Sequence, residues 1–213
     1  MEIKVSIPKK SLKRLVHYQF YLKQLLQKDR DFVSNERLAV DLNLSIAEVR
    51  EDLENFNESL SVSDIHSVDN LLKNVEKYLG HDNTNKAVIV GAGNLGKALL
   101  GFSGFLSFGL DIFMVFDNDD QLISQKLNGK EVFSVSRLEE LTRRLNIDIG
   151  IITTPPEPAQ EIANTLIRAG VKGIWNFSPA VIKVPDHIML KNTSLFSDYM
   201  SLVHKMNKVF VNT

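Results

Sequence analysis

A glycine-rich turn that joins an apolar run to a helix-forming segment limits the possible folds of this chain more than any other feature. The run is Ala87-Val88-Ile89-Val90, the turn is Gly91-Ala92-Gly93-Asn94-Leu95-Gly96, and a helical pattern continues from Lys97 to Phe102. A buried strand, a tight glycine turn and a helix in this order open the βαβ unit of a doubly wound α/β fold. The sequence therefore predicts a parallel sheet of the Rossmann type.

Three positions in the turn need glycine for different physical reasons. Gly91 allows a sharp turn, Gly93 lets a pyrophosphate approach the backbone, and Gly96 allows the helix to pack closely on the strand. Free amides at the start of the helix attract the same anion. We therefore expect residues 91–96 to bind a dinucleotide, although a glycine turn that only packs a helix is the simpler alternative.

An aspartate marks the end of the next predicted strand, residues 112–116. An acidic residue at this place, Asp117, accepts hydrogen bonds from the adenosine ribose in dinucleotide-binding sheets. Asp119 and Asp120 follow it and no arginine stands beside them, so a 2'-phosphate would be repelled. NAD(H) is therefore the expected cofactor, in preference to NADP(H).

Two other strand ends supply candidate cofactor contacts. The predicted strand 147–152 is followed by Thr153, Thr154 and Pro155. The end of the predicted strand 173–176 is marked by Asn176 and Phe177. Open α/β sheets bind ligands at the carboxyl ends of their strands, which favours both groups as contacts. A threonine-proline start of a helix and an aromatic residue in the core are the alternatives that need no ligand.

Three short amphipathic helices are predicted before the glycine turn. The first spans residues 11–27, Val33 and Ser34 open the second, and Ser45 starts the third. Ser45-Ile46-Ala47-Glu48 fits a capping box, in which hydroxyl and carboxylate each accept a hydrogen bond from a free backbone amide. A tight turn between the second and third helices gives the helix-turn-helix pattern, whose last helix enters the major groove of DNA.

Composition excludes several classes of site. The formal net charge is −1, so no global basic field attracts a polyanion, and any such partner must be met locally. There is no cysteine, which excludes disulfides, thiolate nucleophiles and cysteine-ligated metals, and we expect no metal site. Residues 1–8 lack the apolar run of a signal peptide, so we expect a cytoplasmic protein without a membrane anchor.

Taken together, these residues resemble the Rex family of redox-sensing transcriptional repressors. The motifs that carry the resemblance run in order along almost the whole chain: Ile7-Pro8, Arg14-Leu15, Val33-Ser34, Val49-Arg50-Glu51-Asp52-Leu53, the glycine turn from Val90 to Gly96, Gly104-Phe105, Phe116-Asp117 and Gly173-Ile174-Trp175-Asn176-Phe177-Ser178-Pro179. Ordered matches of this extent make the resemblance specific.

The resemblance implies a homodimer whose chains each have three parts. These are a winged-helix DNA-binding domain at 1–80, a Rossmann NAD(H)-binding domain at 81–194, and a C-terminal helix at 195–213 that is swapped across the dimer. Such repressors bind a palindromic operator when NAD+ predominates and release it when NADH closes the dimer. Here the candidate DNA contacts are Lys9, Lys10, Arg14, Ser45 and Arg50, which would hold phosphates or, for Arg50, a guanine edge. A solvated helix end is the alternative for the basic cluster.

The third helix departs from the family pattern in its charge. Rex proteins carry Arg-Lys-Asp or Arg-Arg-Asp there, whereas this chain has Arg50-Glu51-Asp52, and residues 56–63, in the wing region, contain no basic residue. If Val49, Leu53 and Phe56 face inward, helical geometry turns Ala47, Glu51 and Glu54 outward. Two carboxylates would then meet the DNA and oppose the phosphate attraction on which such binding depends.

The residues of the family's redox switch also differ. In Rex proteins a tyrosine after the glycine loop and an aspartate before the terminal helix act together with an amino-terminal arginine. The matching positions here are Phe102 and Ser194, while Arg14 is retained. Because the hydroxyl and the carboxylate are both missing, the charge-linked switch is not carried over to this chain.

Three functions remain open from the sequence. The first is an NAD(H)-responsive transcriptional repressor, and the second is an NAD(H)-binding sensor or scaffold whose DNA binding is weakened or lost. A small NAD-dependent oxidoreductase is the third, but it would need an acid or base beside the nicotinamide. None of the five histidines, at positions 17, 66, 81, 187 and 204, follows a central strand. We therefore expect no catalytic residue.

Overall fold

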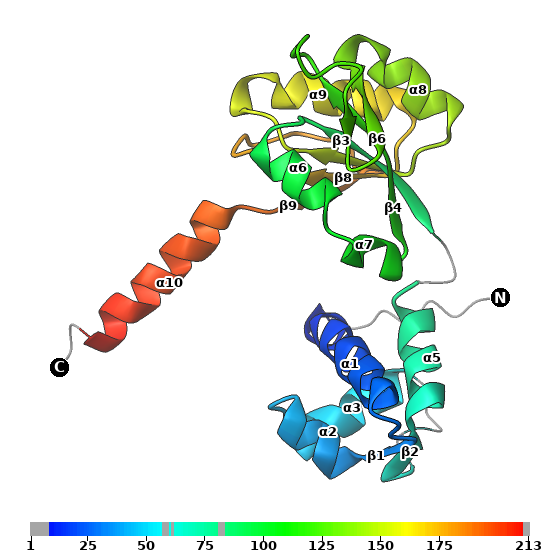
Figure 1. The fold of residues 1–213 in the computed structure, drawn as a ribbon. Coiled ribbons are helices and arrows are strands. Elements are labelled where there is room, and N and C mark those ends of the chain that lie inside the picture. Colours follow the sequence, from blue (N-terminus) through cyan, green and yellow to red (C-terminus); the bar gives the residue numbers. More distant parts are fainter. Residues whose placement is uncertain (1–8, 57–59, 61, 81–83, 211–213) are drawn as a thin grey trace. The chain divides into compact units, whose positions relative to one another are not determined.

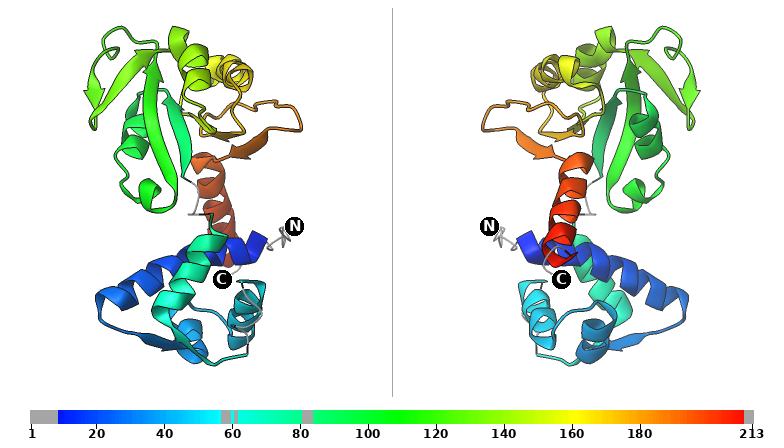
Figure 2. Two further views of the ribbon diagram at one scale, coloured as in Figure 1. Left: turned by 90° about the vertical axis from the view of Figure 1, so that its right-hand side faces the viewer. Right: turned by 90° about the vertical axis from the view of Figure 1, so that its left-hand side faces the viewer.

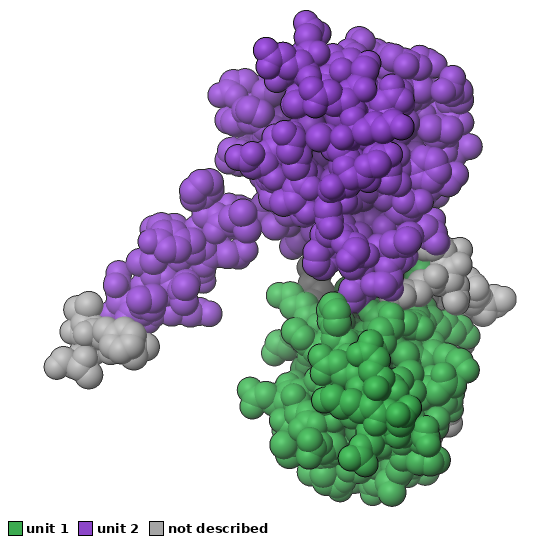
Figure 3. Space-filling model, in the orientation of Figure 1, with its two compact units in different colours: residues 1–83 green, residues 84–213 purple. Residues whose placement is uncertain are grey.

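The protein forms two compact units, residues 1–83 and 84–213 (Figure 3). The structure is a computed structural model and describes residues 9–56, 60, 62–80 and 84–210 (Figure 1). Within these residues, no helix combines the length and the apolar character needed to cross a lipid bilayer. The expected division into three parts, with boundaries at 80 and 194, stays a prediction.

Unit 1 is a helix-turn-helix unit with a small antiparallel sheet. Its elements are α1 (Lys9–Gln27), β1 (Phe32–Ser34), α2 (Asn35–Asp41), α3 (Ile46–Phe56), β2 (Ile65–Ser67) and α5 (Val68–Tyr78). Val33 pairs with His66 across the two strands. The side chain of Ser34 accepts a hydrogen bond from the Arg37 amide and so caps α2, which means that Val33 belongs to a strand and not to the predicted helix.

The face of α3 that was expected to point outward does so. Val49 and Leu53 are fully buried in the core of unit 1, while Ala47, Glu51 and Glu54 are exposed. The side chain of Phe56 lies outside the described residues, as do residues 57–59 and 61 of the predicted wing region. The helix that would enter a DNA groove therefore presents two carboxylates.

Unit 2 contains a seven-stranded sheet in the order β5-β6-β4-β3-β7-β8-β9. All neighbouring pairs are parallel except β5 and β6, which form a hairpin around Asn128 and Gly129. The strands are β3 (Asn85–Val90), β4 (Leu110–Asp117), β5 (Lys126–Leu127), β6 (Lys130–Ser134), β7 (Ile149–Ile152), β8 (Gly173–Asn176) and β9 (Met189–Asn192). This topology confirms the predicted doubly wound fold.

Helices cover both faces of the sheet. They are α6 (Asn94–Leu100), α7 (Gly104–Ser107), α8 (Leu138–Arg144) and α9 (Pro156–Ala169), preceded at α8 by a 3-10 turn (Val135–Arg137). Val88 and Val90 of β3 pack with α8 and α9, whereas Ala87 and Ile89 pack on the face that carries α6. Because β3 lies between β4 and β7, the chain leaves it on one side and returns on the other, which opens a crevice at its carboxyl end.

The last helix, α10 (Leu195–Phe210, red in Figure 2), exposes apolar side chains. Those of Leu195, Phe196, Tyr199, Met200, Leu202 and Met206 are each about half exposed or more. An apolar helix face of this length that is exposed to solvent is typical of an interaction site. Its exchange across a dimer stays a prediction.

Candidate functional site

A cavity of about 620 Å³ lies at the carboxyl ends of the central strands of unit 2. Six residues expected to bind the cofactor line it, and they are Gly91, Gly93, Asp117, Thr153, Thr154 and Pro155. The volume lies in the range typical of small-molecule sites. The glycine turn, the end of β4 and the loop after β7 therefore meet around one space.

The glycines differ in what a side chain would contact. Gly91 has a φ of +110°, which favours glycine, and a Cβ at Gly96 would lie 1.9 Å from the Gly91 carbonyl oxygen. At Gly93, in contrast, an added Cβ would have no described atom within 4 Å. Gly91 and Gly96 are needed by the fold itself, whereas the space above Gly93 is open to a ligand.

Asp117 is held in place by backbone amides. Its Oδ2 accepts a hydrogen bond from the Ala92 amide (2.5 Å), and its Oδ1 accepts from Asn118 (2.8 Å) and Asp119 (2.9 Å). A carboxylate has about four lone-pair positions, so acceptor capacity remains for the hydroxyls of a ribose. The group is thus fixed before a ligand arrives.

Further carboxylates line the same cavity. Asp119, Glu157 and Glu161 line it together with the apolar side chains of Leu122, Val135 and Ile162. Like charges repel a phosphate group on the adenosine, whichever hydroxyl carries it. The two glutamates were not among the residues expected to line the site, although their positions in the first turns of the helix after Thr153-Thr154-Pro155 were a usable signal.

The two threonines after β7 have different surroundings. Thr153 Oγ1 donates to the carbonyl oxygens of Gly91 (2.7 Å) and Val90 (3.1 Å), so it braces the glycine turn. The hydroxyl of Thr154 is buried and has no hydrogen-bond partner among the described residues. A buried hydroxyl without a partner is destabilising, which makes Thr154 the better placed of the two for a ligand contact.

Asn176 and Phe177 do not line this cavity. The amide of Asn176 donates to the Ala180 carbonyl and to Asn192, and its oxygen accepts from the Ser178 amide. The Phe177 ring packs against Trp175 at 4.8 Å between centroids. Both side chains are accounted for by contacts within the fold, and a cofactor contact by either one stays a prediction.

Arg14 points into unit 1. Its Nε and Nη2 each lie 2.6 Å from an oxygen of Asp52, whose side chain is fully buried, and its Nη1 lies 3.2 Å from Glu48. The hydrogen bond to Asp52 raises the pKa of Arg14 above its usual value. Arg14 therefore ties α1 to α3.

Three of the other candidate DNA contacts, Lys10, Ser45 and Arg50, are exposed on unit 1. Ser45 and Glu48 form the predicted capping box, with Ser45 Oγ accepting from the Glu48 amide (3.2 Å) and Glu48 Oε2 accepting from the Ser45 amide (3.0 Å). Arg50 is half exposed and donates to Asp64 (3.0 Å). Lys10 is exposed, and the side chain of Lys9 lies outside the described residues.

The two altered switch positions have ordinary structural contacts. Phe102 is 54% exposed and packs edge-on against Phe105, with 5.0 Å between the ring centroids. Ser194 Oγ accepts a hydrogen bond from the Ser197 amide (3.1 Å) at the start of α10. Their part in any switch stays a prediction.

Comparisons with known proteins agree with both units. Residues 82–180 match the family model described as "CoA binding domain", and residues 6–54 match "Putative DNA-binding protein N-terminus". A redox-sensing transcriptional repressor Rex from Carboxydothermus hydrogenoformans is 42% identical over 89% of this chain and 91% of its own length. The chain belongs to the Rex family. The Rex protein of Bacteroides fragilis is 34% identical over 95% of this chain and 92% of its own.

Solved structures of a Rex-family repressor, RSP, have the same fold. RSP in complex with beta-NADH superposes with a TM-score of 0.85 at 33% identity and covers 97% of both chains. RSP in complex with beta-NAD+ and operator DNA gives a TM-score of 0.86 at 33% identity over 96% of this chain and 94% of its own. Rex proteins are transcriptional repressors, so the oxidoreductase alternative does not apply.

Proposed function

We propose that this Rex protein is an NAD(H)-responsive repressor that binds palindromic operator DNA as a homodimer and releases it when NADH replaces NAD+. The observation that carries the proposal is the cavity of unit 2, where open space above Gly93 faces the fixed carboxylate of Asp117. RSP, whose fold this chain shares, has been solved with NADH and with NAD+ and operator DNA.

The charge of the cavity supports NAD(H) as the ligand. The open space beside Gly93 leaves room for a pyrophosphate, and Asp117, Asp119, Glu157 and Glu161 line the same cavity. These carboxylates disfavour a phosphate on the ribose, which NADP(H) carries at its 2' position and coenzyme A at its 3' position. Metal ions play no part in this proposal.

Dimer formation is assigned to α10. The exposed apolar side chains of this helix would be buried against a second copy of the chain, which is what a swapped terminal helix requires. A repressor acts where its operator is, so the proposal includes a cytoplasmic location.

DNA binding is the step that decides between this function and its main alternative. The full-length protein would be titrated with a fluorescent duplex that bears an inverted repeat, at low salt, with NAD+ or with NADH. We expect binding with NAD+ that NADH weakens by about 5- to 150-fold, the usual range of allosteric coupling. Tight NADH binding without DNA binding in either state would refute the proposal.

Tight NADH binding without DNA binding would instead favour an NAD(H)-binding sensor or scaffold. The exposed carboxylates Glu51 and Glu54 on α3, and the pairing of Arg50 with Asp64, are the observations that favour it. Raising the salt concentration distinguishes the two functions, because phosphate contacts by lysine and arginine weaken steeply with salt.

A further inference from the structure

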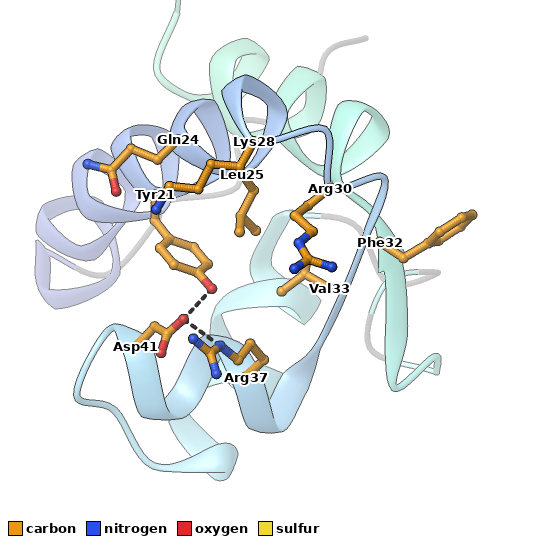
Figure 4. Close-up of a pocket in the computed structure, with 9 residues that line it drawn as sticks. All are labelled: Tyr21, Gln24, Leu25, Lys28, Arg30, Phe32, Val33, Arg37 and Asp41. Carbon is orange, nitrogen blue, oxygen red and sulfur yellow. Dashed lines mark hydrogen bonds and ion pairs between the residues drawn. The ribbon is translucent and has the colours of Figure 1, made fainter.

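A second cavity, of about 470 Å³, lies within unit 1 (Figure 4). Its walls come from the C-terminal half of α1, from the segment that leads into β1, and from α2. Neither the recognition helix α3 nor the residues of the dinucleotide cavity line it. The cavity is therefore separate from both sites described above.

Three cations and one carboxylate line this cavity. Asp41 is engaged by the Tyr21 hydroxyl and by Arg37 Nε (2.7 Å), as the dashed lines in Figure 4 show. Within the described part of the chain, neither Lys28 nor Arg30 has an ion-pair partner. Asp41, the one carboxylate of the lining, lies close enough to Lys28 for the lysine to help lower its pKa, so the three cations outnumber the carboxylates of the wall by two.

The backbone conformation at the end of α1 positions Arg30 at the wall of the cavity. The amides of Asp29 and Arg30 donate to the carbonyl oxygens of Leu26 (3.1 Å) and Leu25 (3.0 Å), and Asp29 has a φ of +53°. These bonds form the Schellman motif, which folds the second residue after the helix back over its last turn. They also occupy helix-end carbonyls that would otherwise repel an anion.

Charge alternates along this segment, but only the cations reach the cavity. Asp29 and Asp31 are exposed and do not line it, whereas Lys28 and Arg30 do. Leu25 and the buried Val33 give the floor an apolar character, which reduces competing hydration. Arg37 is oriented from the opposite wall by its bond to Asp41.

We infer that this cavity binds a phosphate-type anion through Lys28, Arg30 and Arg37. Charge-assisted hydrogen bonds from arginine and lysine are the usual means of holding such groups. The anion has two possible sources, a free phosphate or phosphate ester, and a backbone phosphate of DNA beside α2. The first source is independent of the proposed function, and the second rests on it.

The experiment uses the full-length protein and two double variants. Lys28→Ala/Arg30→Ala removes the unpaired charges of the cavity, and Lys73→Ala/Lys77→Ala removes two exposed charges of α5 as the matched control. Both variants should stay close to the parent in thermal stability, because all four side chains are exposed and the control loses only a weak, exposed pair of Lys73 with Asp69. Calorimetry would measure binding of inorganic phosphate and of pyrophosphate, with ionic strength held constant by sodium chloride.

For a free anion, we expect saturable binding that falls at least tenfold in Lys28→Ala/Arg30→Ala and stays within twofold in the control. For a DNA phosphate, operator binding in phosphate-free buffer should weaken, and its salt dependence should fall by about one to two released counterions, in the cavity variant alone. The inference is overturned if phosphate and pyrophosphate do not bind and DNA affinity is the same in both variants. A parent chain that binds phosphate but no DNA contradicts the proposed function and leaves the cavity assignment standing.

Discussion

Replacing Arg14 by methionine tests the tie between α1 and α3. The methionine keeps most of the apolar stem but removes the two hydrogen bonds of 2.6 Å that Arg14 donates to the fully buried carboxylate of Asp52. Breaking a buried ion pair by removing one partner costs about 3–5 kcal/mol. The contact of Arg14 with Glu48, whose side chain is 43% exposed, adds little to this value.

The exposed pair of Lys73 and Asp69 is a matched control. Its N···O distance is also 2.6 Å, but both side chains are more than half exposed. We therefore expect Lys73→Met to cost about 0.3–0.5 kcal/mol, the usual value for such a helix pair. The two pairs have equal N···O distances, but the Arg14 pair is buried, has two hydrogen bonds and joins two helices, so the difference between the variants measures these effects together.

Hydrogen exchange measured by mass spectrometry is the suitable assay, because it reports the opening free energy of unit 1 separately from unit 2. The double variant Arg14→Met/Asp52→Leu should recover most of the lost stability, since an apolar pair replaces the ion pair. If Arg14→Met costs no more than Lys73→Met, Arg14 is not a buried tie. That result would favour the roles expected for Arg14 from the sequence, in DNA contact and in switching.

Three further predictions concern single sites. Gly93→Ala should weaken NADH binding and leave the melting temperature unchanged. Gly96→Ala should lower both the melting temperature and the NADH affinity, because its Cβ would lie 1.9 Å from a backbone oxygen. Equal melting temperatures for the two variants would contradict this prediction. Burial lowers the pKa of His66 below its usual 6.5, so the unfolded state takes up the proton first, and unit 1 should lose stability as the pH falls below about 6.5. The slope should be at most about 1.4 kcal/mol per pH unit and should vanish in His66→Gln, as hydrogen exchange at two pH values would show. Ser45→Ala removes half of the capping box and should cost about 1 kcal/mol in denaturant unfolding, while an unchanged midpoint would argue that the cap is dispensable.

The fold was predictable where the pattern is local. The strand, turn and helix around Gly91 and the capping box at Ser45 each depend on neighbours within a few residues. Val33 was misassigned because a strand of three residues has no period of its own. Its pairing with His66 is fixed by a partner that the local sequence does not reveal.

Long-range contacts account for the site features that were missed. Arg14 and Asp52 lie 38 positions apart, and nothing near either residue marks the pair. The hydrogen bond of Asn176 to Asn192 likewise depends on the pairing of β8 with β9, in which the two residues lie opposite each other. Glu157 and Glu161 are the exception, because they lie in the first turns of α9, directly after Thr153-Thr154-Pro155, and that local position was a usable signal.

The bond between Thr153 and the glycine turn links cofactor binding to the integrity of unit 2. Thr153 Oγ1 reaches Gly91 only while β3 and β7 are paired, so the turn and the sheet form and dissolve together. A ligand that binds only the assembled turn raises the free energy of unfolding. The increase is about 2.7 kcal/mol at a ligand concentration one hundred times its Kd. If the proposed function holds, the concentration of dinucleotide in a cell would then determine the lifetime of the folded repressor as well as its DNA binding.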